Sequence, residues 1–227
     1  NERTQSMTTM TGGQAAVAAL QTEEVKHVFG LIGSATMEMF DALYDASDIQ
    51  FIGVHDERTG THMADGYARA SGRAGVILAG QNGPGATNLV TGLAQAAAAF
   101  SPVVSIAGAI SSAHLYRDAF QEVDQQALFK PVTNKTWTAT GADRVPEMFR
   151  EAFRTALTPR RGPVQLNLPR DVLSASADYP AYQSPQSYRS QSVPAGAQSA
   201  IDQAASLLAG ATRPVIIAGG GIKNTEG

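Results

Sequence analysis

The sequence lacks cysteine altogether, and it also lacks long apolar runs and clusters of basic residues. The absence of cysteine excludes disulfide bonds and thiolate metal ligands. The apolar stretch from Pro102 to Ile110 is about half the ~20 residues that a membrane-spanning helix needs. Because no basic run is longer than Arg160-Arg161 and the formal net charge is −3, we expect no nucleic-acid partner and no membrane partner. Cytoplasm is the expected compartment, since no basic segment followed by an apolar stretch opens the sequence.

The composition is that of an ordinary globular protein, with 43% hydrophobic and 16% charged residues. The length of 227 residues exceeds the ~100–200 typical of one domain. We therefore expect one complete domain and part of a second. The first six residues carry no pattern, and we expect residues 1–10 to be a disordered or tag-like N-terminus.

From Thr11 to Pro169, short apolar runs alternate with segments of helical periodicity. This alternation is typical of repeated βαβ units around a parallel sheet, and the nearly continuous apolar runs suit strands that are buried on both faces. The predicted fold is α/β, a doubly wound six-stranded parallel sheet with helices on both faces. The predicted strands are Val28–Leu31, Ile49–Val54, Ala74–Ala79, Val103–Ala107, Val132–Trp137 and Pro163–Leu168.

Four helices are predicted from periodicity and from capping residues. The first begins after Thr36, a candidate N-cap, and places Met37, Phe40, Leu43 and Tyr44 on one face. The other three are Glu57–Ala70, which stops at Gly72, Thr87–Ala99, and the amphipathic segment Pro146–Leu157. Residues of Thr87–Ala99 are mostly small, so this helix is a candidate for close packing or for an interface.

The texture of the sequence changes after Asp171. Residues 173–196 are rich in Ser, Gln, Pro and Tyr and lack aliphatic periodicity, as is typical of a linker. Ala197–Ala209 then predicts a helix, and Arg213–Gly221 predicts a buried strand that enters a Gly-rich turn. One strand and one helix cannot close a core. Residues 197–227 are therefore expected to be the start of a second, truncated α/β domain.

Three polar segments follow predicted strands and so fall on one edge of the sheet, where doubly wound folds bind ligands. They are His55–Arg69, Gly80–Asn88 and Asp118–Asp124. Each also has a purely structural interpretation. Acidic residues favour the first turn of a helix, Gly-Pro-Gly forms turns, and a polar stretch forms a solvated loop.

The order and spacing of these segments carry a family resemblance. Together with Phe29–Ser34 after the first strand and Gly162–Asp171 at the end of the domain, they make the chain resemble the thiamin-diphosphate enzymes of the acetohydroxyacid (acetolactate) synthase type. The resemblance implies that residues 11–172 are the pyrimidine-binding domain and that residues 197–227 open the central domain of that family.

The resemblance implies that Glu57 activates the cofactor. A carboxyl group that donates its proton to N1′ of the aminopyrimidine favours the imino tautomer, whose N4′ then removes the thiazolium C2 proton. By the same resemblance, the other cofactor-binding residues are Gly33, Gly83, Pro84, Gly85 and Asn88, and Gln121 shares a catalytic role with Glu57. The implied substrate pocket consists of Ser34, Gln81, Asn82, Phe120 and Gln121.

Two stretches depart from the usual pattern of acetohydroxyacid synthases. Ile32-Gly33-Ser34 replaces Pro-Gly-Gly, and Gln81-Asn82 replaces Ser or Thr-Ser before Gly-Pro-Gly. Both look more like sulfoacetaldehyde acetyltransferase, which makes acetyl phosphate and sulfite. The leading interpretation is decarboxylation of a pyruvate-like 2-oxo acid and transfer of the two-carbon unit to an acceptor. The acetyltransferase and a non-catalytic, cofactor-binding or partner subunit are the alternatives.

The family holds the diphosphate and Mg²⁺ with a Gly-Asp-Gly motif in a C-terminal domain, and these 227 residues contain no such motif. We therefore expect no metal ligand in this chain, and we expect the chain to be inactive alone. The resemblance implies a small-molecule substrate and a homodimer or homotetramer, with Thr87–Ala99 as the candidate interface. FAD in the central domain is left open as a further cofactor.

Overall fold

We describe residues 7–190, 195–220 and 222 from a computed structural model. The chain divides into two compact units, residues 1–189 and residues 190–227. The first unit contains all the strands that the structure assigns in the described residues. Among the described residues, no helix is long and apolar enough to cross a membrane.

A six-stranded parallel sheet with the order β3-β2-β4-β5-β7-β6 forms the centre of the first unit. It confirms the predicted doubly wound α/β fold. The middle strands β4, β5 and β7 are buried almost throughout, which explains their continuous apolar runs. The strands are β2 His27–Leu31, β3 Gln50–Gly53, β4 Gly75–Ala79, β5 Val103–Ala109, β6 Lys135–Thr138 and β7 Val164–Pro169.

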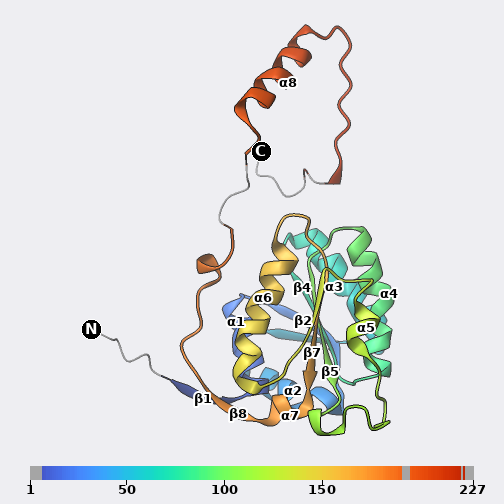
Figure 1. Cartoon of the computed structure of the whole chain (residues 1–227), viewed down its shortest axis with the longest axis vertical. Helices are drawn as coiled ribbons and strands as arrows, with labels where there is room; N and C mark the ends of the chain where they lie inside the picture. Colours follow the sequence, from blue (N-terminus) through green and yellow to red (C-terminus); the bar gives the residue numbers. More distant parts are fainter. Residues whose placement is uncertain (1–6, 191–194, 221, 223–227) are drawn as a thin grey trace, which may run out of the picture. The chain divides into compact units, whose positions relative to one another are not determined.

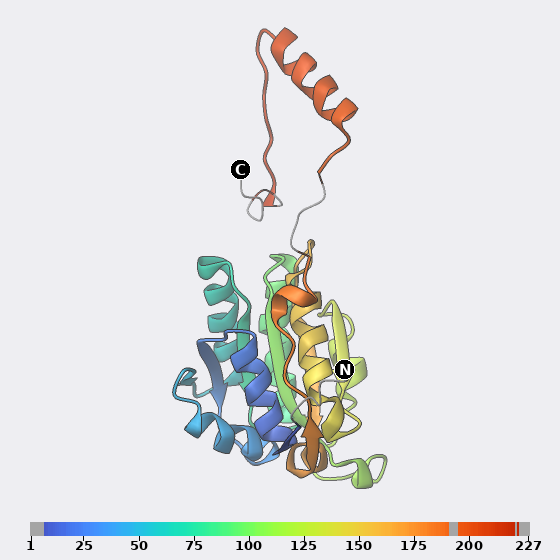
Figure 2. The same cartoon turned by 90° about the vertical axis from the view of Figure 1, so that its left-hand side faces the viewer.

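Helices cover both faces of the sheet (Figure 1). One face packs against α1, α2 and α6. The other packs against α3, α4 and α5. Figure 2 looks onto the first of these faces, where α1 in blue and α6 in yellow lie near each other. The helices are α1 Gly12–Thr22, α2 Met37–Asp45, α3 Glu57–Ser71, α4 Pro84–Ala98, α5 Gln125–Phe129, α6 Val145–Leu157 and α7 Arg170–Ser174, with short 3₁₀ turns at Ser34–Thr36, Ser112–His114, Ala142–Arg144 and Pro185–Ser187.

The start of α2 differs from the prediction. A 3₁₀ turn precedes the helix, and the hydroxyl of Thr36 donates to the carbonyl of Ala79, 3.2 Å away, instead of capping α2. The face predicted to be buried is also partly wrong, because Met37 is 50% exposed and Tyr44 is 91% exposed. Leu43 is buried as predicted, but Met39, which lies outside the predicted stripe, is also buried. The buried face of the helix is therefore rotated relative to the predicted stripe.

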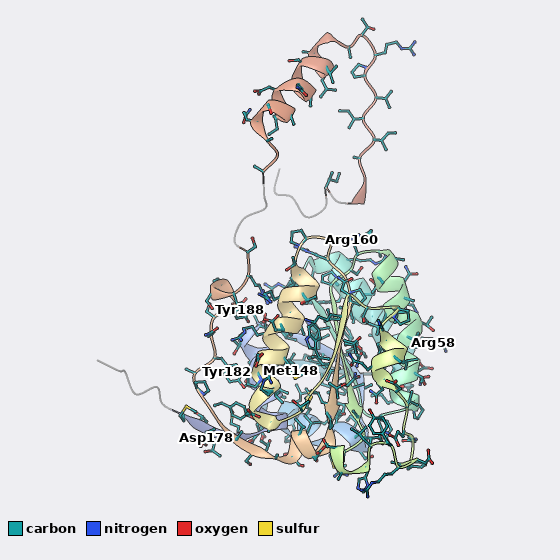
Figure 3. All side chains as sticks on the ribbon, in the orientation of Figure 1. Arg58, Met148, Arg160, Asp178, Tyr182 and Tyr188 are labelled. Atoms are coloured by element: carbon teal, nitrogen blue, oxygen red, sulfur yellow. The ribbon has the colours of Figure 1, made fainter. Side chains whose placement is uncertain are left out.

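The segment predicted to be a linker packs, in large part, against the first unit. Strand β8, Ser176–Tyr179, pairs antiparallel with β1, Thr8–Thr11, so residues 8–10 belong to the fold and are not a disordered tail. Beyond β8 the chain runs along α1 and α6, and Figure 3 labels Tyr182 and Tyr188 beside α6. The hydroxyls of Tyr179 and Tyr182 donate to backbone carbonyls, each over 2.7 Å. Tyrosine side chains therefore hold this segment in place. Because the prediction of a linker relied on the absence of aliphatic periodicity, it did not detect these aromatic contacts.

The second unit contains α8, Gln198–Gly210, close to the predicted helix. The predicted strand is wrong for the residues that are described: Val215, Ile216 and Ile217 belong to no strand and are 76–94% exposed. Gly221, its last predicted residue, lies outside the described residues. A strand needs a partner to satisfy its backbone groups, and none of the described strands belongs to this unit.

Candidate active site

The loops after β2 and β4 meet where the winding of the sheet reverses. In the sheet, β2 lies between β3 and β4. The chain leaves β2 toward β3 on one side of it, and it leaves β4 toward β5, in the opposite direction. A Cβ on Gly33 would lie 2.4 Å from the carbonyl oxygen of Gly80, and a Cβ on Gly80 would lie 2.1 Å from the nitrogen of Gly33. Only glycine at both positions permits this backbone contact. Ligands of doubly wound sheets bind in the crevice at such a reversal.

Glu57 is the first residue of α3, and its side chain points into the protein. Asp56 is the N-cap of α3, where it accepts a hydrogen bond from the backbone N–H of Arg58 over 2.8 Å. Since Asp56 already caps the helix, capping does not explain why the carboxylate of Glu57 is buried, with only 4% of the residue exposed. Asn88 on α4 donates from Nδ2 to Oε2 of Glu57 over 3.0 Å.

The other carboxylate oxygen of Glu57, Oε1, has no hydrogen-bond partner in the described part of the chain. Gly85 lies beside it, and a Cβ added to Gly85 would lie 3.1 Å from this oxygen. The preceding Gly83 adopts φ 53° and ψ −105°, a conformation that favours glycine. Pro84 then begins α4, where its missing N–H costs no helical hydrogen bond. The turn therefore brings backbone without side chains up to the free oxygen.

A network of amide side chains occupies the same sheet edge. Gln81 donates from Nε2 to Oε1 of Gln121 over 2.7 Å, and the hydroxyl of Ser34 donates to Oε1 of Gln81 over 3.0 Å. Asn82, which is 7% exposed, donates from Nδ2 to the carbonyl oxygen of Gln121 over 2.9 Å. Residues from three loops are thereby linked by hydrogen bonds.

The structure brings most of the predicted site residues together. Glu57, Asn88 and Gly85 form one cluster, and Ser34, Gln81, Asn82 and Gln121 form the second. The clusters adjoin at Gly85, where an added Cβ would lie 3.1 Å from Cβ of Gln81. Phe120 is different: its side chain is 83% exposed, and only its carbonyl takes part, accepting from Asn82 over 3.4 Å.

Two residues of the predicted polar segments that were not assigned as site residues also shape this edge. Gly80 permits the backbone contact with Gly33, and its signal was a glycine directly after a buried strand. Glu122 accepts two backbone hydrogen bonds within its own loop, an interaction that leaves no sequence signature. In the described residues, no group of three or more His, Cys, Asp or Glu side chains is placed to hold a metal ion.

The residues present fit the aminopyrimidine of thiamin diphosphate. A buried carboxylate with one oxygen held by Asn88 and the other without a partner suits a protonated ring nitrogen. The backbone of the Gly83-Pro84-Gly85 turn leaves room for a flat ring beside that oxygen.

The relatives agree with this fit. Residues 10–128 match the family model described as thiamine pyrophosphate enzyme, N-terminal TPP binding domain, named for the same cofactor. The chain is 44% identical over 218 residues to a probable acetolactate synthase large subunit of Methanocaldococcus jannaschii, covering 94% of this chain and 36% of the relative. It is 39% identical over 216 residues to the acetolactate synthase large subunit of Corynebacterium glutamicum, covering 94% and 34%. It is 34% identical over 223 residues to the Haemophilus influenzae large subunit, covering 97% and 39%.

The chain thus spans about a third of the length of these relatives. The match to the family model covers Glu57 at the start of α3, Asn88 on α4 and the loop that carries Gln121. The resemblance to thiamin-diphosphate enzymes of the acetolactate synthase type is confirmed. The chain belongs to the thiamine pyrophosphate enzyme family and contains its N-terminal TPP-binding domain.

Proposed function

We propose that this chain is the N-terminal part of an enzyme that decarboxylates a pyruvate-like 2-oxo acid and transfers the two-carbon unit to an acceptor, as an acetolactate synthase does. The observation that carries the proposal is the buried Glu57 carboxylate, with Oε2 held by Asn88 and Oε1 free beside Gly85. The names of the relatives support the choice of substrate class.

Thiamin diphosphate, when bound, supplies the carbon nucleophile for attack on the 2-oxo acid. Glu57 holds a proton on Oε1 for transfer to N1′ of the aminopyrimidine, and Asn88 fixes the orientation of the carboxyl group through Oε2. Burial excludes water, which strengthens this hydrogen bond. Gln121, held by Gln81 and Asn82, presents an amide side chain to the substrate at the same edge.

The complete enzyme requires parts that lie outside this chain. Mg²⁺ and the diphosphate are held by another domain, and the active enzyme is a homodimer or homotetramer in the cytoplasm. The mostly small residues of α4 support that helix as a subunit contact, since small side chains allow close approach. This chain alone is expected to bind the cofactor weakly, because affinity for thiamin diphosphate comes mainly from the phosphates and the metal.

The test is carbon dioxide release from pyruvate by the complete protein with thiamin diphosphate and Mg²⁺. We expect Glu57→Gln to lower kcat by at least ~100-fold, since the amide cannot give up a proton to N1′. The matched control is Glu151→Gln, which removes the carboxylate of a surface ion pair with Arg154 and is expected to leave kcat unchanged. A wild type that releases no carbon dioxide would refute the proposal that the substrate is a pyruvate-like 2-oxo acid. Acetyl phosphate formation from sulfoacetaldehyde would then be assayed.

A further inference from the structure

The loop between β5 and α5 carries an unusual concentration of left-handed backbone. Tyr116, Asp118 and Gln121 have φ values of 63°, 50° and 62°. Residues other than glycine are strained in this region, and they remain there only where surrounding contacts impose it. This short segment therefore needs anchors, and it contains both Phe120 and Gln121.

One anchor is the carboxylate of Glu122. Its Oε1 accepts a hydrogen bond from the backbone N–H of Tyr116 over 2.7 Å, and its Oε2 accepts one from the backbone N–H of Ala119 over 3.0 Å. The N–H of Glu122 in turn donates to the carbonyl of Ala119 over 3.0 Å. A single side chain thus closes the loop onto itself.

The charged form of Glu122 is the one that makes these contacts. The N–H of Tyr116, followed by that of Ala119, lowers the pKa of the Glu122 carboxyl below its ordinary value. The carboxylate is therefore ionised at neutral pH, and both of its oxygens accept charge-assisted hydrogen bonds.

The second anchor attaches the end of the loop to the candidate active site. Asn82 and Gln81 donate to the backbone and side-chain oxygens of Gln121 over 2.9 and 2.7 Å. A Cβ on Gly83 would lie 2.3 Å from the carbonyl of Gln121, so the loop touches the turn that begins α4. Between the two anchors the loop surrounds an open hollow of about 420 Å³ lined by Tyr116, Asp118, Ala119, Gln121 and Glu122.

We propose that Glu122 is a positioning residue, whose carboxylate fixes the loop of residues 116–121 and thereby places Gln121 for the substrate. The proposal rests on the proposed function for the identity of that substrate and for the role of Gln121 beside it. Glu57 and Asn88 lie on α3 and α4, and in the described residues neither shares a hydrogen bond with Glu122. Loss of the Glu122 carboxylate therefore changes substrate use and leaves cofactor activation intact.

The test compares Glu122→Ala and Glu122→Gln with the control Glu147→Gln in the complete protein. Glu147 is also a partly exposed glutamate with an ordered partner, Arg144, but it lies on α6. Hydrogen–deuterium exchange of the peptide containing residues 110–124 reports the loop directly, and tryptic cleavage after the exposed Arg117 reports it independently. Steady-state kinetics then give kcat, KM for pyruvate and the activation constant for thiamin diphosphate.

In Glu122→Ala we expect exchange of the Tyr116 and Ala119 amides and cleavage after Arg117 to accelerate about tenfold or more, since two charge-assisted hydrogen bonds are lost. Glu122→Gln keeps one acceptor oxygen, so its exchange and cleavage rates are expected to lie between those of the wild type and Glu122→Ala. We expect KM for pyruvate to rise about tenfold, with an activation constant for thiamin diphosphate equal to that of Glu147→Gln.

An unchanged rate of amide exchange in Glu122→Ala would overturn the proposal that Glu122 fixes the loop. Accelerated exchange with an unchanged KM for pyruvate would overturn the proposal that the loop places Gln121 for the substrate. A wild type without pyruvate turnover would contradict the proposed function instead. The exchange and cleavage rates need no substrate, so they would still support or overturn the role of Glu122 in fixing the loop.

Discussion

The approach of α3 to α4 determines whether Glu57 meets Asn88, and Gly92 permits that approach. A Cβ added to Gly92 would lie 2.5 Å from Cβ of the fully buried Thr61. Normal carbon contacts are ~3.5–4.0 Å, so Gly92→Ala has to move the helices apart by about 1 Å. The 3.0 Å hydrogen bond from Asn88 to Glu57 then exceeds the range in which it is effective.

The expected cost follows from two opposing effects. Overpacking costs ~1–3 kcal/mol, and a clash this short with a rigid β-branched neighbour places Gly92→Ala near the upper end. Replacing glycine by alanine within a helix recovers ~1 kcal/mol. We expect Gly92→Ala to lower the free energy of unfolding by about 2 kcal/mol.

Gly66→Ala is the matched control, because Gly66 lies within α3 and a Cβ there meets nothing within 4 Å. It is expected to raise the free energy of unfolding by ~1 kcal/mol. Urea unfolding followed by fluorescence of Trp137, the single tryptophan, measures both variants in the first unit. A difference between the two variants below ~1 kcal/mol would show that the helices accommodate the methyl group, and the argument would fail.

Two further substitutions separate the roles of local contacts. Gly85→Ala is expected to leave the free energy of unfolding within ~1 kcal/mol of wild type and to abolish thiamin-diphosphate-dependent turnover, because the methyl group covers Oε1 of Glu57; wild-type turnover would contradict this. Burial, and next the neighbouring Tyr179, raise the pKa of Tyr182. The unfolded tyrosine therefore loses its proton first, and the stabilising contribution of Tyr182 is complete below about pH 10 and declines above it by up to ~1.4 kcal/mol per pH unit. The alkaline decline should be shallower in Tyr182→Phe, in which the other tyrosines with pKa values raised by burial, Tyr179 and Tyr188, still contribute. Equal alkaline slopes in both proteins would contradict the assignment.

The sheet could be predicted because its central strands are apolar along their whole length. Strands such as β4 and β5 are covered on both faces by helices, and burial on both faces leaves a continuous signal in the sequence. The small sheet of β1 and β8 leaves no such signal. Its register pairs Thr8 with Tyr179, and neither a four-residue threonine-rich strand nor its distant partner is recognisable alone.

The candidate site was predictable to the extent that it depends on chain order. Strand ends of a parallel sheet share one edge, so the start of α3 at Glu57 and the loops that carry Gln81 and Gln121 had to be neighbours. Their individual contacts depend on details that the pattern does not contain. The left-handed φ of Gln121 and the closure of its loop by Glu122 are set by backbone hydrogen bonds. The sequence pattern also does not reveal that Phe120 is exposed.

The glycines at this edge serve two distinct purposes. Side chains on Gly33 and Gly80 would lie 2.1–2.4 Å from backbone atoms, so these residues are required for the chain to fold as it does. A side chain on Gly85 would lie 3.1 Å from its nearest neighbours, one of which is Oε1 of Glu57. Small shifts relieve such a contact, and alanine is a better helix former than glycine. Folding therefore does not require glycine at position 85 as it does at positions 33 and 80, and the glycine there is best explained by the need to leave the carboxylate of Glu57 accessible to a flat ligand.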